Sequence, residues 1–219
     1  MKPSVAAQNR IDPRFVSKLS TFNITKLSEK HLHSISSTIT RMAGYDNNIL
    51  EQIPKITTAT IEIFNFLVNN FPPTPSKFYY KLTLRDISRV FEGLCSTAQE
   101  TMLQSNYLIR VWRNEIHCAF FDRLNSKEER DLAESKLSDL IKVYFTTESN
   151  FALANPMVFG NFSQAVRRIT EVIDDSRLYR DLGNFADIRK PLNQVMESYN
   201  ASHQKEPLKL VLLTQPFNI

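Results

Sequence analysis

Residues 83–94 read TLRDISRVFEGL, and this stretch decides how the chain folds. Thr83 followed three positions later by Asp86 has the form of a capping box, although Asp stands where Glu is usual. The apolar side chains recur at helical spacing: Leu84, Ile87, Val90, Phe91 and Leu94. The stretch therefore predicts an amphipathic helix whose first turn carries Arg85, and in which Asp86 can pair with Arg89.

Two helices are expected before this stretch. The first spans about 28–43, with Ser28 as its N-cap and Gly44 just past its end. Four apolar residues predict its core-facing side: Leu32, Ile35, Ile39 and Met42. The second helix fills 56–71, behind a connection that begins at Ile53-Pro54, and the PPTP run that follows stops it.

Regular structure is also expected after this stretch and near the start of the chain. Four further helices are predicted, over 98–124, 126–145, 161–172 and 184–199. The apolar run LKLVLL at 208–213 favours a buried strand or an edge element. Residues 1–27 look irregular or mixed, with Phe22–Ile24 as a short buried strand. The chain is therefore predicted to be mostly helical.

Composition argues against several kinds of site. The chain has 4 glycines, and none stands in the spacing of a P-loop, so this chain alone cannot build a phosphate cradle. Its 2 cysteines cannot form a disulfide framework and favour a reducing compartment. The net charge of +4 favours an ordinary solvated surface over a nucleic-acid footprint.

Membrane and metal sites are not expected either. The sequence lacks an apolar run of about 18 residues, and Met1–Arg10 lacks the apolar core of a signal peptide. His31 and His33 are two positions apart, so on a helix they point in nearly opposite directions. Surface histidines are therefore favoured over metal ligands.

A second charged stretch lies on the expected helix over 98–124. Trp112, Arg113 and Glu115 are followed by Asp122 and Arg123 among aromatic residues. Structural ion pairing that orients helices is favoured over catalysis for this group.

Several motifs together resemble dynein heavy chains of the axonemal type. The similarity lies at the third AAA+ module and the stretch that leads into the fourth, and it covers about residues 1–200. The matching pieces, in order, are DPRF at 12–15, FNI at 22–24, PPTPSKFYY at 72–80, LRDISRVF at 84–91, VWRNE at 111–115, Phe120, DRL at 122–124 and FGNF at 159–162.

The resemblance implies a mainly α fold, an AAA+ helical lid bundle with a short α/β remnant at the N-terminus and further helices at the C-terminus. Residues 1–27 would end the large subdomain, 28–124 would form the lid of the third module, and 125–219 would be a helical connection towards the fourth. Walker A and Walker B would lie upstream of Met1. The chain would then be a fragment without ATPase activity of its own.

The resemblance also implies roles for particular residues. Arg85 stands at the sensor-2 position, where a planar guanidinium can reach the β- and γ-phosphates of ATP, or ADP, bound with Mg to the same module. Lys2 stands at the sensor-1 position, and Arg14 is the nearest candidate for an arginine finger offered to a neighbouring module. Structural roles are expected for Asp86, Arg89, Trp112, Arg113, Glu115, Asp122 and Arg123.

The function implied is that of a lid in an ATP-driven microtubule motor, where it couples nucleotide state to movement of the ring. Its partners would be neighbouring AAA+ modules of the same heavy chain and, through the parent, microtubules and other dynein subunits. Nucleic acid and membranes are not expected partners. The location would be the cytoplasm and cytoskeleton, in the axoneme of a cilium or flagellum. The alternative is a helical protein–protein interaction module without nucleotide chemistry, and a small metal- or thiol-dependent enzyme is disfavoured.

Overall fold

The computed structural model describes residues 12–20, 22, 27–97, 105–155, 157–160, 180–183, 185–203 and 207–210. Within them the chain is mainly helical. The long helices are α2 (Glu29–Met42), α4 (Ile53–Asn70), α5 (Leu84–Cys95), α6 (Ser105–Ala119), α7 (Lys127–Tyr144) and α10 (Phe185–Ser202). Shorter pieces are α1 (Pro13–Val16), α3 (Asn47–Leu50), η1 (Phe78–Tyr80), η3 (Phe121–Arg123), α8 (Ser149–Ala152), and the paired strands β1 (Phe159–Gly160) and β2 (Arg180–Asp181).

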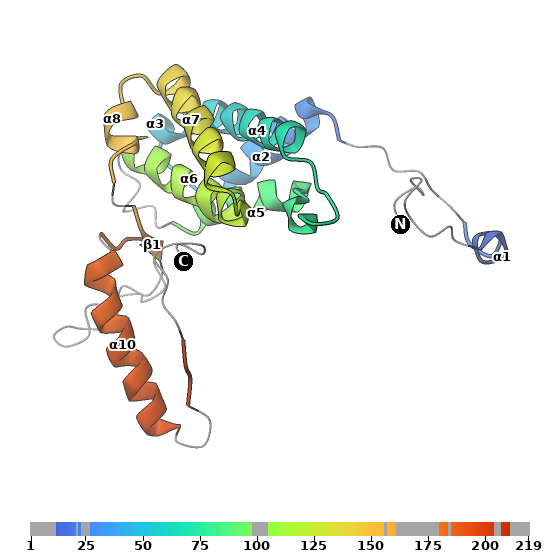
Figure 1. Cartoon of the computed structure of the whole chain (residues 1–219). Helices are drawn as coiled ribbons and strands as arrows, with labels where there is room; N and C mark the ends of the chain where they lie inside the picture. Colours follow the sequence, from blue (N-terminus) through green and yellow to red (C-terminus); the bar gives the residue numbers. More distant parts are fainter. Residues whose placement is uncertain are drawn as a thin grey trace.

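Helices α2 to α8 form one bundle, in which α5 packs on α6, α2 packs on α4, and α7 packs across α4 (Figure 1). Aromatic and aliphatic side chains from all the long bundle helices except α2 fill its centre. The largest fully buried ones include Trp112, Phe91, Phe120, Phe121, Phe145 and Leu67. Figure 1 shows α1 and α10 outside the bundle, and α1 buries none of its residues.

The central prediction is confirmed. Helix α5 runs from Leu84 to Cys95, its capping box forms, and Ile87, Val90, Phe91 and Leu94 are each at most 2% exposed. The predicted helix over 126–145 is present as α7, and the last predicted helix is present as α10. Gly44 follows α2 with a φ of +78°, the left-handed conformation in which glycine is favoured.

The prediction for the buried face of α2 is wrong. Ile35, Ile39 and Met42 are 48%, 45% and 82% exposed, whereas Ser36 and Thr40 are buried. The Thr40 hydroxyl donates to the Ser36 carbonyl at 2.9 Å, so its polar atom is satisfied inside the helix. Because both side chains are small and the Thr40 hydroxyl is satisfied within the helix, α2 can turn them towards the bundle and leave Ile35, Ile39 and Met42 outside.

The predicted continuous helix over 98–124 is wrong at its end. Helix α6 ends at Ala119, and the chain turns through η3. Phe120 lies 6.1 Å from Phe64 and Phe121 lies 4.8 Å from His117, measured between ring centroids, and both phenylalanines are buried. Adjacent residues of a straight helix point about 100° apart, so the break lets both rings enter the core.

Smaller expectations also need correction. Helix α4 already begins at Ile53 and carries Pro54 in its first turn, where the missing N–H costs no hydrogen bond. Residues 13–16 are helical, and Phe22 is 88% exposed rather than part of a buried strand. Residues 207–210 have no regular structure. The predicted helix over 161–172, residues 211–213 of the apolar run, and Asn23 and Ile24 lie outside the described residues.

Candidate functional site

The first turn of α5 holds a buried carboxylate. Asp86 is 3% exposed, and its Oδ2 accepts hydrogen bonds from the Thr83 backbone N–H and the Thr83 hydroxyl, both at 2.8 Å. These bonds anchor the start of the helix in the way that a capping box does.

Arg123 reaches this carboxylate from η3. Its Nη2 pairs with Asp86 Oδ1, and its Nη1 donates to the Lys81 carbonyl at 3.4 Å. Burial alone would raise the pKa of Asp86, but the hydrogen bonds from Arg123 and Thr83 outweigh it and hold the pKa below its usual value. Asp86 therefore stays ionised and links α5 to η3.

Arg89 makes the i, i+3 pair that the sequence allows, with its Nη1 3.8 Å from Asp86 Oδ1. Its side chain is 59% exposed, so solvent screens the pair, which is worth about 0.2–0.5 kcal/mol.

Arg85 differs from both of these arginines. It lies in the first turn of α5 and is exposed. Among the residues that the structure describes, no carboxylate pairs with its guanidinium. Arg85 is thus a permanent positive charge that faces outward and is available to an anion from outside the bundle.

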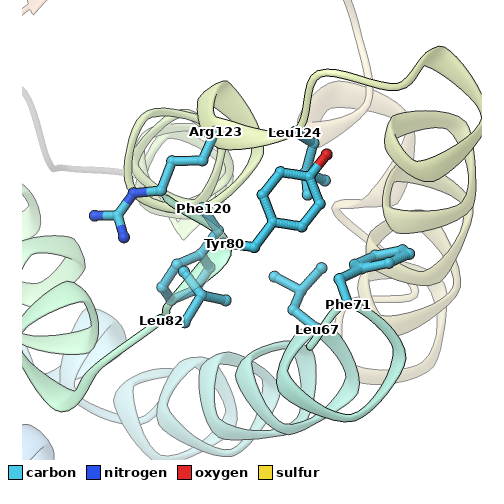
Figure 2. A pocket seen from close by; sticks show the side chains of 7 residues that line it. All are labelled: Leu67, Phe71, Tyr80, Leu82, Phe120, Arg123 and Leu124. Atoms are coloured by element: carbon cyan, nitrogen blue, oxygen red, sulfur yellow. The ribbon is translucent and has the colours of Figure 1, made fainter. Parts of the chain in front are cut away.

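The cavity next to this site is apolar and too small for a nucleotide. Its volume is about 10 Å³, room for about one water molecule, and its lining is Leu67, Phe71, Tyr80, Leu82, Phe120, Arg123 and Leu124. Figure 2 shows the guanidinium of Arg123 pointing away from the apolar side chains, while its stem lies beside Phe120. The small cavity beside Arg123 therefore has no room for a nucleotide, which could meet Arg85 only at the surface of the bundle.

A second group of charges lies on α6 and is buried. Arg113 is 4% exposed, its Nη2 lies 2.7 Å from Glu134 Oε1, and its Nη1 donates to the Ala152 carbonyl at 3.2 Å. His117 Nε2 lies 2.9 Å from Glu134 Oε2. Burial would raise the pKa of Glu134, but His117 and Arg113 together lower it to about 2. This group joins α6, α7 and α8.

Arg110, which the sequence did not single out, extends the group. It is 8% exposed, its Nε lies 3.0 Å from Asp181 Oδ2 on β2, and its Nη1 donates to the Ala154 carbonyl at 2.9 Å. The sequence signal that could have identified Arg110 is its position three residues before Arg113 on the same helix. Its partner, 71 residues further on, could not be foreseen from spacing.

The remaining candidates are scattered. Trp112 is fully buried and its Nε1 donates to the Thr60 hydroxyl at 2.8 Å. Glu115 packs over Gly93, and Asp122 is exposed on η3. Arg14 is exposed in α1, far from the bundle (Figure 1), and Lys2 lies outside the described residues.

No group of three or more His, Cys, Asp or Glu side chains in the described part of the chain is placed to hold a metal ion. None of the helices described is both long and apolar enough to span a bilayer.

Part of the bundle matches a known protein family. Residues 34–130 match the family described as "Dynein heavy chain, ATPase lid domain". Dynein axonemal heavy chain 10 of Homo sapiens is 34% identical over 205 residues, which cover 93% of this chain and 4% of that protein. Dynein-1-alpha heavy chain, flagellar inner arm I1 complex, of Chlamydomonas reinhardtii is 32% identical over 216 residues, which cover 96% of this chain and 5% of that protein.

A more distant relative also matches nearly the whole of this chain. Dynein axonemal heavy chain 2 of Mus musculus is 26% identical over 219 residues, which cover 98% of this chain and 5% of that protein. The chain thus spans a twentieth or less of the length of these three relatives. The match over residues 34–130 covers α4 to α6 and most of α2, including the turn that carries Arg85. Over these residues, the chain is an ATPase lid domain of the dynein heavy chain family.

Proposed function

We propose that this lid couples the nucleotide state of an AAA+ module, the third of the ring, to rigid-body movement of the neighbouring modules in an ATP-driven axonemal microtubule motor. The relatives are named as axonemal or flagellar dynein heavy chains, which supports a place in the axoneme of a cilium or flagellum. The partners would be adjacent AAA+ modules, other dynein subunits and microtubules.

Arg85 is the residue through which this lid would sense nucleotide. The observation that supports this is its exposure in the first turn of α5 with no carboxylate partner among the described residues. A guanidinium can donate two parallel hydrogen bonds to phosphate oxygens. The remaining parts of an ATP–Mg site would come from outside this chain, because its glycines cannot form a phosphate cradle.

A substitution in a heavy chain that contains this lid tests the proposal. We expect Arg85→Ala to weaken nucleotide binding at this module by about 10- to 100-fold, the loss of a hydrogen bond between charged groups, and to impair ATP-dependent release from microtubules. Arg89→Ala is the matched control, because it removes an exposed arginine one turn further along the same helix. Unchanged nucleotide affinity and release in Arg85→Ala would overturn the role of Arg85.

The alternative, an interaction module without nucleotide chemistry, has less support. The match over residues 34–130 is to an ATPase lid. The aromatic and charged helix that favoured the alternative uses its charged groups inside the bundle, as Arg113 does with Glu134.

A further inference from the structure

We infer that Arg123 is a positioning residue for Arg85: it engages the Asp86 carboxylate, fixes the first turn of α5 against η3, and so leaves Arg85 free for phosphate. This inference rests on the proposed function of Arg85. It adds a residue 38 positions further along the chain to the nucleotide-sensing surface.

Both oxygens of the Asp86 carboxylate are occupied. Oδ2 accepts two hydrogen bonds from Thr83, and Oδ1 faces Arg123. Arg89 contributes only a contact at 3.8 Å from an exposed side chain. Asp86 is 3% exposed with Arg123 in place, so loss of Arg123 would leave Oδ1 of this carboxylate without its close charge partner.

Arg123 binds the chain on both sides of Thr83. One nitrogen donates to the Lys81 carbonyl before it and another to Asp86 after it. The stem of Arg123 lines the same small cavity as Leu82 and Phe120, and its guanidinium is directed away from these apolar side chains (Figure 2). The turn that carries Arg85 is therefore clamped to η3 at two points.

Arg123 also compensates the negative charge of Asp86, which is the residue next to Arg85. Without Arg123, a buried carboxylate in the same helical turn would lower the positive potential at Arg85 and weaken its attraction for an anion.

A double variant in the heavy chain separates this role from simple support of the fold. Arg123→Met keeps an apolar stem but removes the charge, and we expect it to weaken binding of a fluorescent ADP analogue by about 3- to 10-fold. Adding Asp86→Asn should recover most of the lost affinity, because the uncompensated charge disappears while an amide oxygen can still accept hydrogen bonds from Thr83. Further loss of affinity in the double variant would overturn the inference, since a purely structural role predicts it.

Two measurements on the 219-residue chain test the action of Arg123 without nucleotide. In Arg123→Met, the pKa of Asp86 should rise in a carbon-detected NMR titration, and the amides of 84–88 should exchange faster with solvent. Arg130→Met is the matched control, because the Arg130 guanidinium binds the Leu124 carbonyl beside η3 at 2.8 Å. Arg130→Met should leave the pKa of Asp86 and the amide exchange of 84–88 unchanged. An unchanged Asp86 pKa and unchanged amide exchange in Arg123→Met would overturn the inference.

The two proposals can fail separately. If Arg85→Ala has no effect on nucleotide binding while Arg123→Met alters the α5 turn, the proposed function fails and the link between Arg123 and Asp86 stands. If Arg85→Ala weakens binding and Arg123→Met does not, the function stands and the positioning role is overturned. In an Arg85→Ala background, Arg123→Met should cost no further affinity.

Discussion

Helices α2 and α5 carry apolar residues at the same helical spacing, but α5 turns them towards the core and α2 turns most of them towards solvent. In α5 the stripe is buried from Ile87 onward, and Val90 and Leu94 are fully buried. In α2 the stripe that includes Ile35 and Ile39 is nearly half exposed, and small hydroxyl side chains face the bundle instead. An apolar repeat of about 3.6 residues predicts that a segment is helical. Which side of that helix faces the core depends on the side chains that the neighbouring helices present to it.

The largest expected effect comes from truncating the buried stripe of α5. Leu94→Ala should lower the free energy of unfolding by about 2–5 kcal/mol, because it leaves a cavity where Leu94 is fully buried. Urea unfolding followed by circular dichroism measures it, with Ile39→Ala on α2 as the control. Equal losses of unfolding free energy in Leu94→Ala and Ile39→Ala would contradict the difference in burial between the two helices.

Acid should weaken the part of the bundle where Glu134 joins α6, α7 and α8 before it acts on α2. Glu134 has its pKa lowered to about 2 in the folded chain, so its contribution to stability is complete above its ordinary value near 4.5. This contribution is lost as the pH falls towards 2. The protection factors of the α6 and α7 amides, which compare the exchange rate with the intrinsic rate at each pH, should therefore fall over that interval, and Glu134→Gln should reduce this dependence. Protection factors that do not change with pH would contradict the ion-pair account.

A smaller effect is expected where α5 crosses α6 at Gly93. A Cβ placed there would lie 2.1 Å from Glu115 Oε2, so Gly93→Ala must displace the Glu115 side chain. We expect a loss of about 1 kcal/mol in thermal unfolding. In a Glu115→Ala background the same substitution should instead stabilise by up to ~1 kcal/mol, because alanine is the better helix former. The same sign in both backgrounds would show that the close approach does not matter.

The smallest effect is expected on the exposed stripe of α2. Ile39→Ser should change the free energy of unfolding by less than about 0.5 kcal/mol in the 219-residue chain, since exposed positions tolerate substitution. Chemical denaturation checks it, with Thr40→Asp on the buried side as the contrasting variant. A loss above 1 kcal/mol for Ile39→Ser would mean that the stripe is covered in solution.

Local signals predicted most of the bundle. Residues 83–94 carried the cap, the apolar stripe and the Asp86–Arg89 pair, because all of these form between neighbours in sequence. Contacts between distant residues could not be predicted in the same way. Arg123 lies 37 residues after Asp86, and Asp181 lies 71 after Arg110, so their pairing depends on how the helices pack.

The candidate site was predicted in part for the same reason. The family resemblance pointed to Arg85, and its role stays a prediction. No property of Arg85 itself separates a solvated arginine from a phosphate sensor. The distinction depends on its neighbour Asp86 being occupied by other groups, and that is visible only in three dimensions.

The two hydroxyl side chains that α2 turns inward have a mechanical consequence. Ser36 and Thr40 offer little apolar area, so the attachment of α2 to the bundle gains less from the hydrophobic effect than that of α5. Tension that enters the bundle from the N-terminal side meets α2 first. Under such load we therefore expect α2 to detach from the bundle before α5 does.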